Sequence, residues 1–304
     1  MSPNNQPRIE SGQPSRCFQG SVDVDILAAR SLIPLHVHRM SHVIAIANQK
    51  GGVGKTTTAI NLGASLAVAE KRTLVLDIDP QGNATSGLGV TVEPSSPSIY
   101  SVLIGQNDLR EAIVEGVHFP FLDVVPSTRD LVGAEIELVP ALSRETILRQ
   151  ALASVRDTYE YILLDCPPSL GLLTLNTLTA ADSVLIPIQC EFYALEGLSQ
   201  LLNTVRLVQR GLNPKLDIEG VLLTMYDKRL KLSRQVADEA REYFGAKVYR
   251  SAIPRNVRLA EAPSFGQPII LYDMLSSGAG AYLALAHEVI NHRVGAEEAA
   301  GVAQ

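Results

Sequence analysis

The sequence predicts an α/β fold: one doubly wound, mostly parallel β-sheet with helices on both faces. Two observations lead to this class. Short apolar runs alternate with segments of helical periodicity along the 304 residues, which is the order expected of βα units in a parallel sheet. The first run also enters a glycine-rich loop that precedes a helix, "NQKGGVGKTTTAIN" at 48–61, the arrangement of a phosphate-binding βα turn. The composition, 46% hydrophobic and 19% charged, is that of an ordinary globular protein.

The first half of the chain supplies four predicted strands. Continuous apolar runs predict strands that are buried on both faces, and periodicity near 3.6 residues predicts helices. Ser143 is a suitable N-cap for the second of these helices. In chain order we expect a strand at 42–48, a helix at 55–70, strands at 72–79 and 121–127, a helix at 143–157 and a strand at 159–169.

The second half continues the alternation and ends in a helix. The helix that precedes Gly211 is expected to stop there, because glycine commonly follows the last helical residue. We expect helices at 171–181, 194–210, 233–244 and 278–292, and strands at 182–188, 217–227 and 246–254. In such a sheet, ligands bind at the carboxyl ends of the strands.

The two ends of the chain differ from the segment between them. Residues 1–40 are rich in Pro, Ser, Asn, Gln and Gly and lack apolar periodicity, so we expect a disordered extension. They do not resemble a signal peptide, since no basic start leads into an apolar core. We expect one domain over 41–292 and a flexible tail over 293–304. Because Met40 directly precedes the first strand, it stays open whether residues 1–39 are translated.

Cysteine content, hydropathy and charge argue against several classes. Cys17, Cys166 and Cys190 are widely spaced, which disfavours a disulfide framework or a zinc cluster and suits a reducing cytoplasm. No apolar run approaches the roughly 18–20 residues needed to span a bilayer. The net charge is −6, but residues 221–260 carry nine basic and four acidic side chains, a net +5, against −11 for the rest. Such a stretch is usually a solvated face.

The glycine-rich loop nearly matches the phosphate-binding motif G-x-x-x-x-G-K-[ST]. Gly54, Lys55 and Thr56 form its end, whereas Gln49 replaces the opening glycine. Lys55 is expected to reach the β- and γ-phosphates of a nucleotide, and the Thr56 hydroxyl to coordinate Mg²⁺. A second lysine, Lys50, precedes the glycines and has no role in the ordinary motif.

The backbone of this loop is expected to surround the phosphates. Successive N–H groups ahead of a helix make an anion-binding turn, and glycine permits close approach of the backbone. The loop residues concerned are Gly51, Gly52, Val53 and Gly54.

Two aspartates follow neighbouring strands and are expected to face the loop. Asp165 ends "YILLD", the position of a Mg²⁺-associated carboxylate. Asp79 ends "LVLDID" and precedes "PQGNATSG", which we expect to be mobile; its carboxylate can orient the attacking water. Asp77, one pleat earlier, is expected to face away. Asp79, Asp165 and Thr56 are the candidate metal-site residues.

These motifs resemble those of the ParA/MinD ATPases. "KGGVGKTT" is similar to the family's deviant Walker A motif, and "LDIDPQGNATSGLG" and "LLDCPPSL" resemble its switch regions. "TMYDKR" and "IPRNVRLAEAPSFG" resemble the chromosomal ParA (Soj) branch in particular. The likeness extends from about Met40 to residue 292. It implies a deviant Walker A P-loop fold and hydrolysis of ATP with Mg²⁺.

The resemblance also implies roles for individual residues. The family's signature lysine matches Lys50 and reaches across a dimer into the partner's ATP, while Lys55 serves its own subunit's ATP. Asp79 matches the water-activating aspartate, and Thr57 matches a residue on the α-phosphate. Pro254 and Asn256 are expected beside the adenine.

The same likeness implies three partners. ATP would join two subunits in a sandwich homodimer, and a centromere-binding ParB protein would stimulate hydrolysis. Chromosomal ParA dimers bind double-stranded DNA without sequence preference, through arginines that match Arg229 and Arg258. Both lie in the +5 stretch, together with Lys228 and Lys231, so that stretch is expected to contact phosphates. A cytoplasmic, nucleoid-associated protein is implied.

Other members of the superfamily fit the sequence less well. A MinD-type membrane ATPase would end in a basic amphipathic helix, whereas this chain ends "NHRVGAEEAAGVAQ", so no membrane contact is expected. An iron–sulfur carrier would need cluster cysteines at a dimer seam, and Cys166 and Cys190 are expected to be buried. Forty residues are too few for an added DNA-binding module. A protein that binds ATP without turnover stays open, as does the choice between chromosome and plasmid.

Overall fold

The structure is a computed structural model that describes residues 41–191 and 196–302. The disordered extension predicted for residues 1–40 lies outside the described residues, so it stays a prediction. These described residues all belong to one compact unit. In the part of the chain that is described, no helix is both long enough and apolar enough to cross a membrane.

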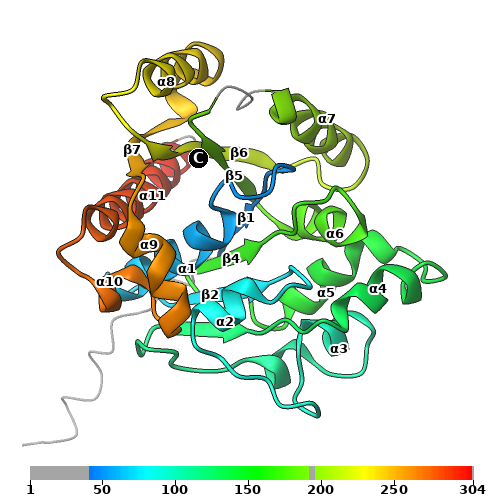
Figure 1. Ribbon diagram of the computed structural model, residues 1–304. Coiled ribbons are helices and arrows are strands. Elements are labelled where there is room, and N and C mark those ends of the chain that lie inside the picture. The colour runs from blue at the N-terminus through cyan, green and yellow to red at the C-terminus, as the bar shows by residue number, and fades with distance from the viewer. Residues whose placement is uncertain (1–40, 192–195, 303–304) are drawn as a thin grey trace, which may run out of the picture. The chain divides into compact units, whose positions relative to one another are not determined.

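A seven-stranded sheet forms the centre of this unit (Figure 1), with strand order β3-β2-β4-β1-β5-β6-β7. Every pairing between these strands is parallel. This arrangement confirms the predicted doubly wound sheet and puts the carboxyl ends of all strands at one edge. The strands are β1 His42–Ile46, β2 Thr73–Asp77, β3 Leu122–Val125, β4 Tyr161–Asp165, β5 Ser183–Gln189, β6 Asp217–Tyr226 and β7 Val248–Pro254.

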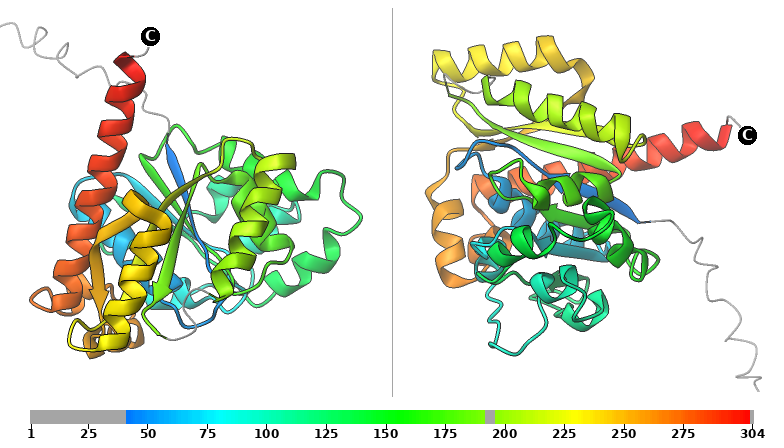
Figure 2. Two further views of the ribbon diagram at one scale, coloured as in Figure 1. Left: turned by 90° about the horizontal axis from the view of Figure 1, so that it is seen from above. Right: turned by 90° about the vertical axis from the view of Figure 1, so that its right-hand side faces the viewer.

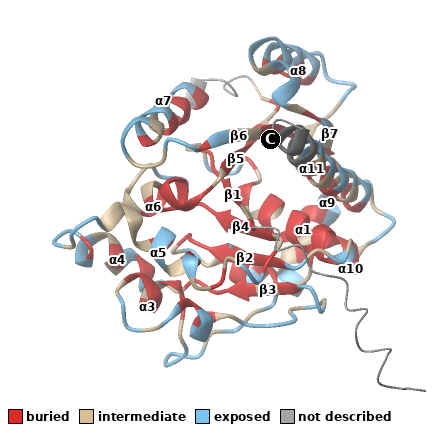
Figure 3. Cartoon of the chain, turned by 180° about the vertical axis from the view of Figure 1, so that it is seen from behind, coloured by how far each residue is buried: buried red, intermediate tan, exposed pale blue. Residues whose placement is uncertain are grey.

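Helices cover both faces of the sheet, as predicted (Figure 3). Along β1, Val43 and Ala45 enter one apolar core, whereas Ile44 and Ile46 enter the other. One face is covered by α1 Lys55–Val68, α10 Ile269–Tyr272 and α11 Ser277–Val302. The other is covered by α3 Ile99–Leu103, α4 Leu131–Glu137, α5 Ile147–Ala153, α6 Leu172–Ala180, α7 Glu196–Gly211 and α8 Lys231–Phe244.

The N-cap predicted at Ser143 is wrong. Ser143 has a left-handed backbone (φ 53°), and its side chain makes no cap hydrogen bond. Its carbonyl instead accepts hydrogen bonds from the backbone N–H and the hydroxyl of Thr146, at 2.9 and 2.8 Å. The chain thus turns tightly through a 3-10 helix at Arg144–Thr146 before α5, which ends at Ala153 rather than 157.

Three other boundaries differ from the prediction. β2 ends at Asp77, and the segment after Asp79 that was expected to be mobile contains the short helix α2, Asn83–Gly87. β4 ends at Asp165, since two prolines follow within three residues and proline cannot donate to the hydrogen bonds of a sheet. The closing helix α11 continues to Val302, through most of the expected tail at 293–304, and projects beyond the other elements (Figure 2). Alanine and glutamate, which favour helix, dominate that segment.

Candidate active site

The glycine-rich loop joins β1 to α1 at the carboxyl edge of the sheet. Gly52 (φ 74°) and Gly54 (φ 89°) both adopt the left-handed conformation, in which a side chain is strained. Nothing lies within 4 Å of the position where a Cβ would stand on Gly51 or Gly52. The loop therefore presents open backbone ahead of the N-terminus of α1, which suits an anionic ligand.

Two neighbouring strands hold this loop in place. The side chain of Asn48 donates to the carbonyl of Pro187 in β5 (2.7 Å) and accepts from the backbone N–H of Lys50 (3.0 Å). The buried hydroxyl of Thr224, in β6, donates to the carbonyl of Val53 (2.8 Å). Val53 itself is buried, so its contribution to the site is its backbone. The sequence analysis missed Asn48 and Thr224, which have no motif of their own.

Lys55 lies buried at the floor of the loop. Its ammonium donates to the carbonyl of Lys50 at 3.2 Å. Burial lowers the pKa of Lys55, and the nearby carboxylates of Asp165 and Asp79 oppose that shift. A buried ammonium that shares its site with two carboxylates is suited to receive phosphate oxygens.

Asp165 leaves two acceptors unsatisfied. Both of its carboxylate oxygens are buried, and neither has a hydrogen-bond partner among the described residues. Burial raises its pKa well above 3.8, and the charge of Asp77 adds to the shift. The Thr56 hydroxyl lies close enough to the Asp165 carboxylate to oppose this rise in its pKa. A buried, unpartnered carboxylate beside a hydroxyl fits an oxygen-ligated Mg²⁺.

Asp77 is buried beside Asp79 and Asp165 but does not line the phosphate cavity. Its carboxylate accepts from the backbone N–H and hydroxyl of Thr85 (2.8 and 2.7 Å) and from the N–H of Asp79 (3.2 Å). Burial raises its pKa to about 6, and the bonds from Thr85 oppose the shift. β2 ends at Asp77. Residues two apart in a strand face the same side, so strand alternation does not support the prediction that Asp77 and Asp79 face opposite ways.

Most of the predicted phosphate-binding residues line a single cavity of about 470 Å³. Asp79 is buried against it, and one of its carboxylate oxygens accepts from the N–H of Gln81 at 2.9 Å. Lys50 and Asp165 do not line the cavity, although both lie next to residues that do. The lining comprises Gly51, Gly52, Gly54, Lys55, Thr56, Thr57, Ile60, Asp79, Gln81, Asn83, Ser86, Pro168, Met225 and Pro263.

A second cavity, of about 180 Å³, adjoins the first. It is lined by Pro254 and Asn256, the two residues expected beside the adenine, and it shares Gly54, Thr57 and Met225 with the phosphate cavity. Asn256 also caps the short helix α9, Val257–Glu261, by accepting from the N–H of Arg258 at 2.8 Å. Met225 has a left-handed backbone (φ 51°). No sequence signal marks a strained methionine at the end of a strand.

The four basic residues expected to bind DNA are all exposed. Arg229 makes a two-point ion pair with Asp227, at 2.9 and 2.7 Å, and Arg258 pairs with Glu261 at 3.0 Å. These pairs raise the pKa of both arginines. Lys228 and Arg229 line one surface hollow together with Pro254, which also lines the second cavity. Lys231 begins α8.

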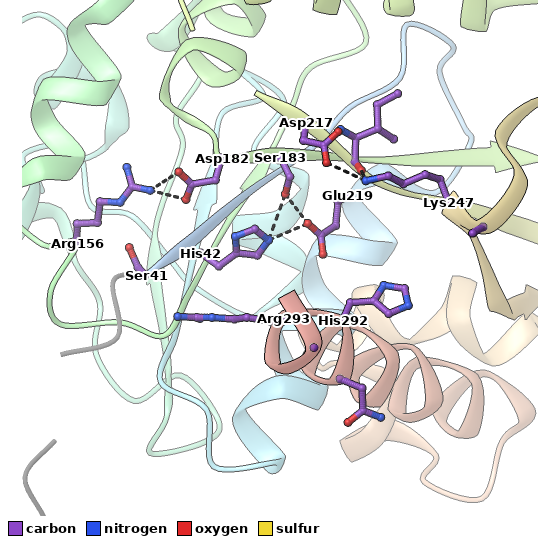
Figure 4. Close-up of a pocket in the computed structure, with 14 residues that line it drawn as sticks. Ser41, His42, Arg156, Asp182, Ser183, Asp217, Glu219, Lys247, His292 and Arg293 are labelled. Atoms are coloured by element: carbon purple, nitrogen blue, oxygen red, sulfur yellow. Dashed lines mark hydrogen bonds and ion pairs between the residues drawn. The ribbon is translucent and has the colours of Figure 1, made fainter. Parts of the chain in front are cut away.

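A larger cavity, of about 880 Å³, lies at the opposite edge of the sheet (Figure 4). It contains none of the predicted site residues. His42 and Ser183, from β1 and β5, both bond the carboxylate of Glu219 in β6, at 2.7 and 2.6 Å. Arg156 pairs with Asp182 nearby. Most of the polar side chains named here therefore bond one another, which favours a structural role for this cavity in joining the ends of the strands.

We expect His42→Ala to lower the free energy of unfolding by about 1–3 kcal/mol, since it leaves Glu219 without one of its two donors.

The same contact makes stability depend on pH. Burial alone would raise the pKa of Glu219, but the bonds and charge of His42 hold it below 4.5. The ionised carboxylate therefore adds stability above pH 4.5 that is lost as pH falls through its folded pKa. Urea unfolding at several pH values checks this. Unchanged stability, with the same loss on acidification, would contradict it.

Comparison with known proteins agrees with the geometry. A protein-family model described as an AAA domain matches residues 41–218. The chain is 61% identical over 250 residues to the sporulation initiation inhibitor protein Soj of Bacillus subtilis, covering 82% of this chain and 98% of that protein. It is 57% identical over 251 residues to the chromosome partitioning protein ParA of Myxococcus xanthus, covering 83% and 88%.

Solved structures show the same fold. Cobyrinic acid a,c-diamide synthase from Mycobacterium smegmatis, solved with ADP and magnesium, superposes with a TM-score of 0.72 at 38% identity, covering 83% of this chain and 95% of that one. The cell division ATPase MinD of Pyrococcus furiosus gives 0.69 at 26%, covering 83% and 99%. The chain therefore has the fold of a P-loop ATPase, and the proteins that it resembles in sequence include a chromosome partitioning protein.

Proposed function

Because the chain belongs to the chromosomal ParA (Soj) branch of the ParA/MinD ATPases, we propose that it partitions DNA through an ATP-driven cycle. ATP joins two subunits, the dimer binds DNA without sequence preference, and a ParB-type protein stimulates hydrolysis and release. The observation that carries this proposal is the convergence of Lys55, Thr56 and Asp79 on one cavity at the carboxyl edge.

The reaction is attack of water on the γ-phosphate. The backbone of the glycine loop and the buried ammonium of Lys55 bind and orient the phosphates. Asp79, held by the N–H of Gln81, accepts a hydrogen bond from the attacking water and directs it. Thr56, Asp165 and Asp79 are the residues that would hold Mg²⁺, which neutralises charge on the phosphate oxygens when bound. Catalysis of this kind consists mainly of positioning and charge neutralisation.

The two lysines divide their work between subunits. Lys55 is buried under its own loop, whereas the side chain of Lys50 does not line its own subunit's phosphate cavity. We therefore assign Lys50 to the ATP of the partner subunit. Pro254, Asn256 and Thr57 line the cavity that would receive the base and sugar. Each ATP then contacts both chains, so ATP binding and dimerisation are thermodynamically linked.

The DNA-binding part of the proposal is tested by salt dependence. We expect Arg229→Ala or Arg258→Ala to weaken binding equally on any sequence. A dimer loses two phosphate contacts, so the slope of log affinity against log salt should fall by about 2. Arg206→Ala, which removes an exposed arginine on α7, is the control. Fluorescence anisotropy at several salt concentrations on two unrelated duplexes measures the effect. Selective loss on one sequence would indicate base readout instead.

The whole cycle is tested by ATP turnover. We expect slow hydrolysis alone and faster hydrolysis with DNA and the cognate ParB. Equal rates under all these conditions would reject the proposed regulation and leave an unregulated ATPase. Binding of ATP with no turnover under any condition would support an ATP-binding protein without enzymatic activity.

A further inference from the structure

An apolar stripe lies on the surface of α4 and of the loop that follows it. Val132, Ile136 and Val139 recur at helical spacing, and Leu142 follows them. All four are exposed, Ile136 to 73% and Leu142 to 96%. We call these four residues the α4 stripe.

The opposite side of the same segment is apolar as well. Leu131, Ala134 and Leu138 are buried in the core beneath α4. A surface helix ordinarily turns polar residues to solvent, so the exposed side of α4 departs from the usual pattern. Contiguous exposed apolar side chains mark interaction surfaces. The charged residues within α4 are Glu135 and Glu137, which makes nucleic acid an unsuitable occupant.

The α4 stripe lies at the same edge of the sheet as the nucleotide site. β3 ends at Val125 and α4 begins at Leu131, so the helix starts where parallel strands carry their ligands. The carboxylate of Glu135 lies against Gly171, where an added Cβ would stand 2.3 Å from it. Gly171 is three residues beyond Pro168, which lines the phosphate cavity. α4 and α6, the helix that Gly171 precedes, lie on the same side of the sheet (Figures 1 and 3).

We propose that a second copy of this chain covers the α4 stripe in the ATP-bound dimer. This inference rests on the proposed function, in which the Lys50 of one subunit reaches the other subunit's ATP. Such a partner must sit over the mouth of the phosphate cavity. Pro168 lines that cavity, and Gly171, three residues further on, lies against Glu135 of α4. A two-fold axis there presents the same apolar residues from both chains. The stripe then supplies apolar area that the polar nucleotide site lacks.

Two variants test the proposal in full-length protein: Ile136→Asp and Leu142→Asp. Both side chains are exposed, so the monomer should fold, and circular dichroism verifies it. A carboxylate in an apolar interface is costly. We therefore expect the dimer dissociation constant, measured by analytical ultracentrifugation with a non-hydrolysable ATP analogue, to rise about tenfold or more. Nucleotide affinity, measured by titration on dilute protein, should change less than about twofold.

Leu207→Asp is the matched control. Leu207 is 65% exposed and lies in the last turns of α7, toward the opposite edge of the sheet. It should dimerise as the wild type does. If Ile136→Asp and Leu142→Asp also dimerise normally, or lose only ParB stimulation, the proposal is overturned while the ATP-driven cycle stands. If the wild type itself stays monomeric with ATP, the sandwich cycle is rejected, and the proposal with it.

Discussion

Lys55→Ala is expected to abolish functional ATP binding. The Lys55 ammonium is the basic group buried at the floor of the phosphate loop, 3.2 Å from the carbonyl of Lys50. A hydrogen bond to a charged group contributes about 1.5–3 kcal/mol, and this lysine is expected to reach two phosphates. Affinity should therefore fall roughly 100-fold or more. Isothermal titration with ATP and Mg²⁺ measures the loss, and dimerisation and DNA binding should disappear with it.

The control for this variant is Lys71→Ala, which removes a half-buried lysine that pairs with Glu160 away from the site. It should bind ATP as the wild type does. Removal of Lys55 also leaves Asp165 and Asp79 without their neighbouring cation, so the empty site itself gains uncompensated acidic charge. Wild-type affinity in Lys55→Ala would mean that the backbone N–H groups alone hold the phosphates, and that the motif has been misinterpreted.

Those parts of the site that depend on local chain geometry could be predicted from the sequence. A glycine loop between a buried strand and a helix has few conformations available, and Gly52 and Gly54 take the left-handed ones. Asp165 also lies at the end of the run "YILLD" and of β4, as the motif predicts, although the predicted strand continued to residue 169. The parallel pairing of the strands could be predicted from the βα alternation, since a helix between two strands returns the chain to the edge where the first strand began.

Features that depend on contacts between distant segments were beyond sequence reasoning. Thr224 and Val53 are 171 residues apart in the sequence. Their hydrogen bond forms because β5 pairs with β1 and β6 pairs with β5 in the sheet. Met225 lines both cavities, and this position depends on how β6 packs in the sheet and not on any local motif. The prediction that Asp77 faces away from Asp79 failed for another reason, since residues two apart in a strand share a face. The α4 stripe has an ordinary helical apolar pattern, and only its exposure distinguishes it from core.

The two lysines of the loop occupy different environments. Lys55 is buried, and burial lowers its pKa. Lys50 is only partly buried, and within the described part of the chain its hydrogen bonds are made by its backbone: the N–H donates to Asn48 and the carbonyl accepts from Lys55. We therefore expect replacement of the Lys50 side chain to preserve these hydrogen bonds of the loop. This separation lets a single substitution distinguish binding of ATP from its use between subunits.

Lys50→Ala should keep ATP binding and lose both dimerisation and hydrolysis. A cation supplied in trans to the γ-phosphate can raise the rate by roughly 10³–10⁵, so turnover should stay at background even with ParB and DNA. Asp79→Ala is the comparison: it lacks the water-orienting carboxylate but retains Lys50, so it should accumulate as an ATP-bound, DNA-bound dimer. Size-exclusion chromatography with ATP, run beside a nucleotide titration, separates the two. If Lys50→Ala dimerises and hydrolyses ATP normally, no contact from Lys50 joins the subunits, and the sandwich arrangement proposed for this chain is wrong.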